Sequence, residues 1–357
     1  MPRLDSLLKD MVQKNASDLF LSSGSPPNYK IHGEIKPVQD ESLSHDTCRQ
    51  LIYELLEDEQ KKKFEEIKDL DFAYEIDGLA RFRGNLFMQR HGISAVFRMI
   101  PAKVKTMDEL GMSDTIKKLA RANRGLILVT GATGSGKSTT LAAMIDLRNR
   151  ERTEHILTLE DPLEFVHENK KCIVHQRQIG EHSRSFAASL RAALREAPDV
   201  IMVGEMRDLE TIGLAITAAE TGHLVYGTLH TSGAAKTVDR IIDAFPEEQQ
   251  NQIRTMIADT LRGVISQILV KRADSQGRAA AFEILVTTQA VSNLIREGKT
   301  FQITSAIQTG KKEGMVTLDQ SLMNLMMTQK ITAEEAFRNA VNKDMFFKYV
   351  IPTKRSA

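Results

Sequence analysis

The spacing of apolar and polar residues changes character near residue 100 of this 357-residue chain. Before that point, Leu4 to Val12 and residues 45–67 have the spacing of helices, and several short segments alternate as strands do. Three of these strands are expected at residues 71–76, 79–89 and 93–98. We therefore expect residues 1–98 to form a small α+β domain, an antiparallel sheet with helices on one face.

Beyond residue 125, continuous apolar segments alternate with helical ones. The apolar segments are residues 126–130, 156–159, 199–203 and 223–229. Such alternation predicts an α/β domain, a mostly parallel sheet covered by helices on both faces. We expect residues 99–112 to be a linker and residues 113–357 to form this second domain. After residue 246 the pattern is largely helical, and a helical C-terminal region is expected from about residue 288.

A phosphate-binding loop is predicted between the first of these apolar segments and a helix. Residues 131–138 fit G-x-x-x-x-G-K-[ST] at every fixed position. In such a P-loop, glycines let backbone N–H groups converge on a polyphosphate, Lys137 reaches the β- and γ-phosphates, and the Ser138 hydroxyl binds Mg²⁺. ATP and Mg²⁺ are the expected cofactors. The residues expected to bind nucleotide are Gly131, Ala132, Thr133, Gly134, Ser135, Gly136, Lys137, Ser138 and Thr139.

Acidic residues follow two of the apolar strands, where ligands of parallel sheets bind. Residues 200–204 lead into Glu205, which we expect to be the general base or the group that orients water. Another strand leads into Glu160 and Asp161, with Glu164 close behind. Glu160 and Glu205 are expected to reach the Mg²⁺ through water. The division of roles among Glu160, Asp161 and Glu164 stays open.

Histidines and arginines supply further site candidates. His230 comes at the carboxyl end of the strand at 223–229, the side of the nucleotide, and His223 at its other end is a weaker candidate. Arginines 81, 83, 90 and 98 lie on strands of the first domain, where they solvate the outer face of a sheet or act across a subunit interface. In the second case Arg83 and Arg98 would be arginine fingers, which stabilise charge on the γ-phosphate.

Composition excludes several classes of protein. The 48 Lys and Arg residues nearly balance 47 Asp and Glu residues, which disfavours a nucleic-acid translocase. The two cysteines lie far apart, so neither a disulfide framework nor a thiolate zinc site is predicted. No apolar run reaches the ~18 residues of a membrane span. We expect a cytoplasmic protein.

Taken together, the motifs resemble the type IV pilus retraction ATPases, the PilT family of secretion-type hexameric ATPases, over nearly the whole chain. Besides the phosphate loop, the resemblance rests on Ser17-Asp18-Leu19, the acidic segment 159–165, the segment 203–208, the histidine segment 221–231 and Gly310 to Met315.

This resemblance implies a PAS-like N-terminal domain, a RecA-like ATPase domain and a homohexamer with ATP between subunits. It makes Glu205 the catalytic glutamate, places His230 in the family's histidine motif, and matches Arg83 and Arg98 to arginines that act in trans. The motor would bind the inner-membrane platform protein of a pilus machine at the inner face of the cytoplasmic membrane. There it would power pilus retraction and twitching motility by removing pilins.

Two departures from the family keep alternatives open. Val291-Ser292 replaces a usual Ile-Arg, and Ala197 replaces the first Asp of Asp-Pro-Asp, as in the accessory retraction ATPases (PilU). One alternative is therefore an accessory subunit of low turnover that works with a paralogous retraction ATPase. Another is a pilus-extension or type II secretion ATPase, which two cysteines and a short N-terminal part fit poorly.

Overall fold

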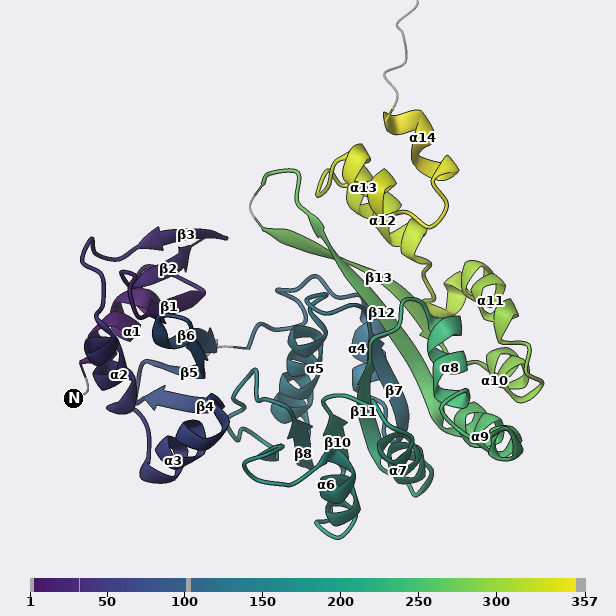
Figure 1. Ribbon diagram of the computed structural model, residues 1–357. Coiled ribbons are helices and arrows are strands. Elements are labelled where there is room, and N and C mark those ends of the chain that lie inside the picture. Colours follow the sequence, from purple (N-terminus) through teal and green to yellow (C-terminus); the bar gives the residue numbers. More distant parts are fainter. Residues whose placement is uncertain (1–2, 32, 101–103, 276, 351–357) are drawn as a thin grey trace, which may run out of the picture. The chain divides into compact units, whose positions relative to one another are not determined.

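The structure is a computed structural model that describes residues 3–31, 33–100, 104–275 and 277–350 (Figure 1). These residues fall into two compact units, the first made of residues 1–103 with the short segment Glu164–Val166, and the second made of the rest of the chain. Residues 101–103 of the predicted linker lie outside the described residues. The rest of that predicted linker, residues 104–112, belongs to the second unit, where Met107 and Met112 are buried in the core.

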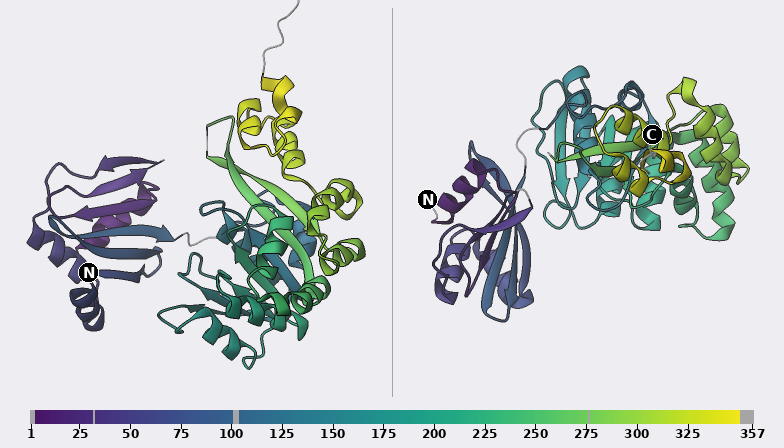
Figure 2. Two further views of the ribbon diagram at one scale, coloured as in Figure 1. Left: turned by 45° about the vertical axis from the view of Figure 1, so that its right-hand side comes forward. Right: turned by 90° about the horizontal axis from the view of Figure 1, so that it is seen from above.

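An antiparallel sheet forms the first unit, with the strand order β3-β2-β1-β6-β5-β4 among the described residues. Its strands are β1 (Asp18–Ser22), β2 (Asn28–Ile31), β3 (Glu34–Pro37), β4 (Asp69–Ile76), β5 (Ala80–Gln89) and β6 (Gly92–Ile100). Helices α1 (Leu4–Gln13), α2 (His45–Tyr53) and α3 (Asp58–Ile67) cover one face (Figure 2). Leu8, Phe64 and Phe82 are buried between helices and sheet. The expected α+β domain is therefore present.

In the second unit, the described strands form a sheet of order β13-β12-β7-β11-β10-β8-β9. Its strands are β7 (Gly125–Thr130), β8 (His155–Glu160), β9 (Ile173–Gln178), β10 (Val200–Val203), β11 (Leu224–Leu229), β12 (Leu261–Lys271) and β13 (Arg278–Val286). Every pair is parallel except β12 with β13. The predicted parallel sheet is thus confirmed.

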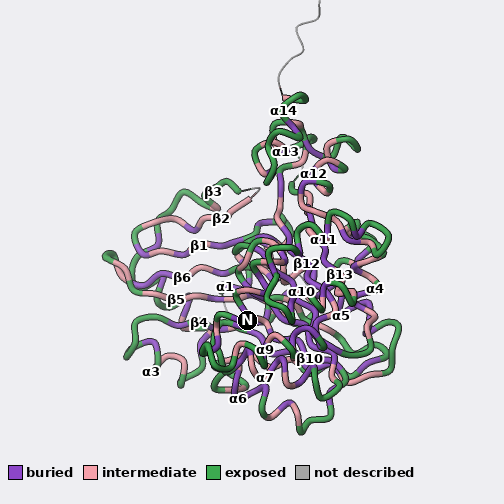
Figure 3. Tube along the Cα trace, turned by 90° about the vertical axis from the view of Figure 1, so that its right-hand side faces the viewer, coloured by how far each residue is buried: buried purple, intermediate pink, exposed green. Residues whose placement is uncertain are grey.

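Helices cover both faces of this sheet, which explains the continuous apolar strands. Along β7, Leu126 and Leu128 face one core while Ile127 and Val129 face the other, and all are buried. Figure 3 shows buried segments gathered around β10 and β12 of the same sheet. The first core includes residues of α6 (Phe186–Ala193), α7 (Leu209–Glu220), α8 (Ala234–Ile242) and α9 (Glu247–Thr260). The second includes residues of α4 (Asp114–Ala120) and α5 (Lys137–Glu151).

The prediction of a largely helical chain after residue 246 is wrong for residues 261–271 and 278–286, which form the paired strands β12 and β13. Pairing with distant residues explains the difference: β12 runs parallel to β7, level with it from Leu261 to Ser266. Local periodicity does not record such a pairing. Strand β9 was not predicted either, and it pairs only with β8 in the described sheet.

A helical C-terminal region follows the hairpin, as predicted. It contains α10 (Gln289–Arg296), α11 (Ile303–Thr309), α12 (Leu318–Met327), α13 (Ala333–Asn339), α14 (Asp344–Val350) and the short 3-10 helices η1 (Thr300–Gln302) and η2 (Lys311–Glu313). Leu322 and Phe346 bury themselves against Val270 of β12 and Ala281 of β13. Within the described ranges, each helix is too short or too polar to cross a membrane.

Candidate active site

Four neighbouring parallel strands end at one edge of the second sheet, and each leads into a predicted site residue. Strand β7 leads into the loop that begins at Gly131, β11 into His230, β10 toward Glu205, and β8 ends at Glu160 (Figure 1). Because these strands are adjacent in the order β7-β11-β10-β8, motifs far apart in sequence meet at this edge. This edge is the candidate active site.

The phosphate loop connects β7 to α5 in a conformation that glycine permits. Gly134 and Gly136 have φ values of 77° and 90°, in the left-handed region. Gly136 is the N-cap of α5 and has no side chain with which to cap the first amides of the helix. Such uncapped N–H groups form a ready anion site. Of the predicted loop residues, Ala132, Thr133 and Gly134 are exposed, while Gly131 and Ser135 are buried.

Lys137 folds back over its own loop. Its ammonium donates hydrogen bonds to the carbonyls of Gly131, at 2.8 Å, and Ala132, at 3.1 Å. Ser138 and Thr139 follow in the first turn of α5, and both are half-buried. The Lys137 ammonium therefore lies at the loop that is expected to bind the phosphates of ATP.

Glu205, His230 and Arg207 form a charged cluster beside this loop. Arg207 Nε lies 2.5 Å from Glu205 Oε1, and His230 Nε2 lies 3.0 Å from the same oxygen. Burial raises the pKa of Glu205, but the hydrogen bond from Arg207 and the charges of Arg207, His230 and Lys137 outweigh it and hold the pKa below its usual value. Glu205 is therefore ionised at neutral pH, as a general base must be.

The backbone that carries Glu205 is held by its neighbours. The Gly204 N–H donates to the carbonyl of Leu159 at 2.7 Å, and the Met206 N–H donates to that of Thr228 at 3.0 Å. The Thr228 hydroxyl also donates to the Gly204 carbonyl. A Cβ at Gly204 would lie 2.9 Å from the Leu159 oxygen, so this position has room only for glycine. Hydrogen bonds to the adjacent strands thereby fix the backbone from which the Glu205 side chain extends.

The acidic residues after β8 differ in environment. Glu160 is buried and accepts hydrogen bonds from the Thr158 hydroxyl, at 2.6 Å, and from the Gln176 amide, at 3.0 Å. Asp161 and Glu164 are exposed. The hydrogen bond that Arg207 donates to Glu205 is the main cause that raises the pKa of Arg207, and the charge of Asp161 adds to it. Of the three acids, Glu160 is thus the one built into the sheet edge.

The other histidine lies at the opposite end of β11, and the N-terminal arginines belong to the first unit. His223 is bound through Nδ1 to the Ala218 carbonyl at 3.0 Å, at the start of β11. Arg83 and Arg98 lie opposite each other on β5 and β6 of the first unit. Each pairs with an aspartate: Arg83 with Asp71 at 3.3 Å and Arg98 with Asp18 at 2.8 Å. Their action in trans stays a prediction.

Sequence reasoning missed two contributors to the site. Arg207 lies in the segment 203–208, which contributes to the family resemblance, but no role was predicted for it, although it binds Glu205. Gln267 of β12 is buried, and its side-chain amide donates to the Ser135 carbonyl of the phosphate loop. The signal that could have revealed it is a glutamine that follows a serine within the apolar stretch from Val264 to Val270, but that stretch was assigned to a helical region.

The residues present fit a Mg²⁺ ion held mainly by phosphate. Among the described residues, no group of three or more His, Cys, Asp or Glu is arranged to hold a metal ion. Mg²⁺ commonly binds through one or two protein oxygens together with phosphates and water. Ser138 in the first turn of α5 and the carboxylates of Glu160 and Glu205 at the same sheet edge supply that kind of donor set.

Comparison with known sequences identifies relatives along nearly the whole chain. A family model for "Type II/IV secretion system protein" matches residues 1–290. The chain is 52% identical to the type IV pilus retractation ATPase PilT of Pseudomonas aeruginosa, covering 94% of this chain and 98% of that protein. It is 48% identical to a twitching motility protein of Neisseria gonorrhoeae, covering 95% and 91%. Identity to the type IV pilus ATPase PilU of P. aeruginosa is 40%, covering 94% and 88%.

Comparison with solved structures finds the same relationship. A crystal structure of the pilus retraction motor PilT with bound ADP matches with a TM-score of 0.90 at 44% identity, covering 97% of this chain and 98% of that one. The match includes the N-terminal domain, the ATPase domain and the helical C-terminal region. The fold expected from the sequence is thereby confirmed.

Proposed function

Because the chain belongs to the family of type II/IV secretion system proteins, we propose that it is an ATP-hydrolysing motor that powers retraction of type IV pili and hence twitching motility. The observation that carries this proposal is the meeting of the phosphate loop, Glu205 and His230 at one sheet edge. Such an edge suits ATP hydrolysis, and 52% identity to a retraction ATPase suggests the work to which hydrolysis is coupled.

ATP would bind over the loop from Gly131 to Thr139. The uncapped amides at the start of α5 would hold phosphate oxygens, and the Lys137 ammonium would exchange its two carbonyl partners for the β- and γ-phosphates. Mg²⁺, when bound, neutralises charge on the phosphates. Ser138 would hold it directly, and Glu160 and Glu205 would hold it through water.

Hydrolysis would depend on Glu205. In the described part of the chain Arg207 and His230 both contact its Oε1, which leaves Oε2 to orient the attacking water. The lowered pKa of Glu205 keeps it ready to accept a proton near neutral pH. His230 directly follows β11 and contacts this carboxylate. The histidine would therefore transmit changes at the γ-phosphate to β11.

The working assembly would be a homohexamer with ATP between subunits. In such a ring, Arg83 and Arg98 of one subunit would reach the phosphates bound by the next, and opening and closing of the interfaces would drive the motion. The motor would act in the cytoplasm, against the platform protein at the inner face of the membrane.

An accessory retraction subunit is the second candidate. Ala197-Pro198-Asp199, with Ala197 in place of the usual aspartate, favours it, because the accessory paralogues share this change. The higher identity to PilT than to PilU, 52% against 40%, favours the principal motor. The two candidates differ in turnover and in whether the protein retracts pili alone.

The decisive experiment measures pilus retraction in a strain whose only retraction-type ATPase is this chain. Retraction with the wild-type chain and none with Glu205→Gln is the expected result. Purified protein should hydrolyse ATP far faster than Glu205→Gln does. If ATP binds but both proteins show equal and negligible hydrolysis, and the strain retracts nothing, the motor proposal fails and the accessory subunit is favoured.

A further inference from the structure

Strand β12 contacts the phosphate loop through one buried side chain. It lies beside β7, with Ser266 level with Thr130, the last residue before the loop. The next residue, Gln267, is 2% exposed. Its amide nitrogen donates to the Ser135 carbonyl at 2.6 Å, and its amide oxygen accepts from the Thr140 hydroxyl at 2.7 Å. One side chain thus joins the loop to the first turn of α5.

Gln267 decides which polar groups of the loop face a ligand. A phosphate binds backbone N–H groups and is repelled by carbonyl oxygens. Because Gln267 binds the Ser135 carbonyl, that oxygen is held toward β12. Gln267 also packs closely against the loop glycines. A Cβ at Gly131 would lie 2.3 Å from the backbone carbonyl oxygen of Gln267, and a Cβ at Gly136 would lie 3.1 Å from its side-chain amide nitrogen.

On the opposite face of the sheet, the same strand holds the start of α8. The Ser266 hydroxyl accepts the Gly233 N–H at 2.9 Å, and Glu283 Oε1 accepts the Ala234 N–H at 2.7 Å. Ser266 and Glu283 are cross-strand partners on β12 and β13. They act as the N-cap that Gly233 itself does not provide.

The start of α8 is also the end of the segment that carries His230. Only Thr231 and Ser232 separate His230 from Gly233. The Thr231 hydroxyl lies 2.7 Å from that of Thr237, one turn into α8, which ties the segment to the helix. His230 contacts Glu205, so a shift of α8 would move the histidine from the carboxylate.

We propose that Gln267, Ser266 and Glu283 are positioning residues of the nucleotide site. Gln267 sets how tightly the phosphate loop holds nucleotide. The pair of Ser266 and Glu283 sets turnover by holding His230 against Glu205. This inference rests on the proposed ATPase function, and it makes one hairpin the common support of two motifs on opposite faces of the sheet.

The first test concerns Gln267→Met, which keeps the volume of the side chain and removes both polar ends. The dissociation constant for ADP with Mg²⁺, measured by calorimetry on the full chain, should rise about tenfold while kcat at saturating ATP changes by less than about twofold. Gln252→Met, at an exposed position of α9, is the matched control and should bind ADP as the wild type does. Unchanged ADP affinity in folded Gln267→Met overturns the proposal. If that variant does not fold, Gln267→Asn is measured in its place with the same outcomes.

The second test concerns Glu283, whose contact with α8 a glutamine can reproduce. Glu283→Leu should lower kcat about tenfold and leave the ADP dissociation constant within about twofold of the wild type. Glu283→Gln keeps an oxygen for the Ala234 N–H and should recover most of the turnover. Glu220→Leu, at an exposed position, is the matched control. A glutamine variant as slow as the leucine variant contradicts the proposed positioning role.

A double variant tests whether Glu283 acts through His230. In a His230→Ala background, adding Glu283→Leu should slow hydrolysis by less than about twofold, because the interaction it supports is already absent. A further tenfold loss would overturn the assignment. Wild-type protein that neither binds ADP nor hydrolyses ATP would instead refute the ATPase itself, which separates the two failures.

Discussion

Lys137 contributes to the site more than to the fold. Its ammonium has carbonyl partners on its own loop, at 2.8 and 3.1 Å, and the side chain is half-buried. Lys137→Ala should therefore reduce ATP hydrolysis by about 10³-fold through lost phosphate contacts. The free energy of unfolding should change by less than about 1 kcal/mol. Near-normal hydrolysis in this variant would refute the assignment of the loop.

His167 makes the stability of the second unit depend on pH. Burial is the main cause that lowers its pKa to about 4, with Asp146 opposing and Lys170 adding to the shift. The unfolded chain, with a histidine pKa near 6.5, therefore binds more protons between these values. The free energy of unfolding should not be reduced by His167 above pH 6.5, and it should fall by about 1–3 kcal/mol as the pH approaches 4.

The check on this prediction is urea denaturation of the wild type and His167→Leu at several pH values. As the pH falls from 7 to 4.5, the free energy of unfolding of the wild type should decrease relative to that of His167→Leu, which has no group to protonate at this position. His182→Asn, at an exposed position of the same unit, should follow the wild type. Parallel curves for the wild type and His167→Leu would show that His167 does not titrate in this way.

At the residue scale, the sequence predicted those groups whose chemistry is local. Residues 131–138 carry the whole loop pattern, and Glu205 and His230 follow apolar strands directly. Gln267 and Glu283 could not be found in this way, because their partners lie 132 and 49 residues away. Only the pairing of β12 with β7 and β13 brings them to the site.

At the scale of helices and strands, too, the elements with a clear local pattern were predicted and those that depend on distant pairing were missed. Strands β7, β8, β10 and β11 were predicted because burial on both faces makes them continuously apolar. Strand β13 begins with Arg278-Ala-Ala-Ala, residues of helical preference, and becomes a strand because its partner β12 is itself paired with β7. Tertiary pairing overrides local preference there.

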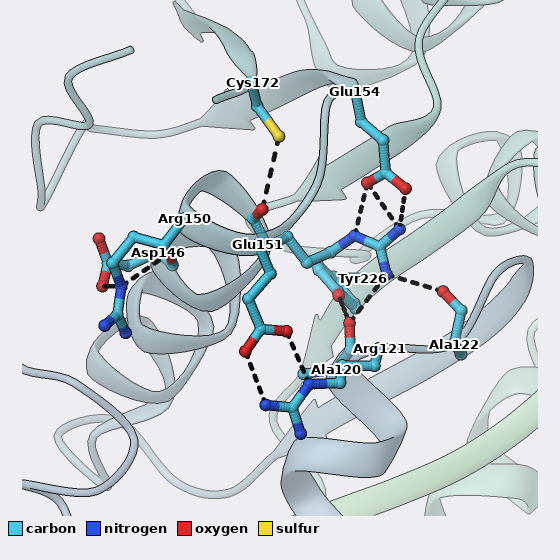
Figure 4. A network of polar contacts seen from close by, with 10 residues as sticks. Ala120, Arg121, Ala122, Asp146, Arg150, Glu151, Glu154, Cys172 and Tyr226 are labelled. Carbon is cyan, nitrogen blue, oxygen red and sulfur yellow. Dashed lines mark hydrogen bonds and ion pairs between the residues drawn. The ribbon is translucent and has the colours of Figure 1, made fainter. Parts of the chain in front are cut away.

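One buried arginine joins three elements of the second unit. Arg148 of α5 binds Glu154, which precedes β8. It also donates to the carbonyls of Ala120, the last residue of α4, and of Ala122 just beyond the helix. Figure 4 labels these three partners. Tyr226 of β11 donates to the same Ala120 carbonyl at 2.7 Å. The Arg148 side chain is 2% exposed, so losing it would leave several buried polar groups unpaired.

Arg148→Met should therefore lower the free energy of unfolding by about 3 kcal/mol. The matched control is Arg121→Met, whose pair with Glu151 lies close by but is about 40% exposed. That variant should cost less than about 1 kcal/mol. Denaturant titration of both variants measures the difference. Equal and small effects would show that the buried junction adds little to the stability of the unit.

At the scale of the whole molecule, the change of pattern near residue 100 corresponds to the division of the chain into two units. The fold of each unit follows from its own hydrophobic pattern and is confirmed by the similarity to PilT. A ring of subunits does not follow from that pattern, because interfaces between copies have no local periodicity. The hexamer and the action of Arg83 and Arg98 in trans stay predictions.

Mixing of variants tests that assembly. Arg83 is 41% exposed and pairs with an exposed Asp71, so Arg83→Ala should fold normally and slow hydrolysis by about 10³-fold. Arg90→Ala, at an exposed turn, should hydrolyse ATP as the wild type does.

Coexpression of Arg83→Ala with Lys137→Ala places an intact Arg83 beside an intact phosphate loop at about a quarter of the interfaces of a randomly mixed ring. Mixed rings should therefore regain about a quarter of the wild-type hydrolysis if interfaces act independently. Because each parent is inactive, any such recovery requires that the arginine and the loop come from different subunits. Activity no higher than that of the parents, in rings shown by mass to contain both variants, would exclude a trans role for Arg83.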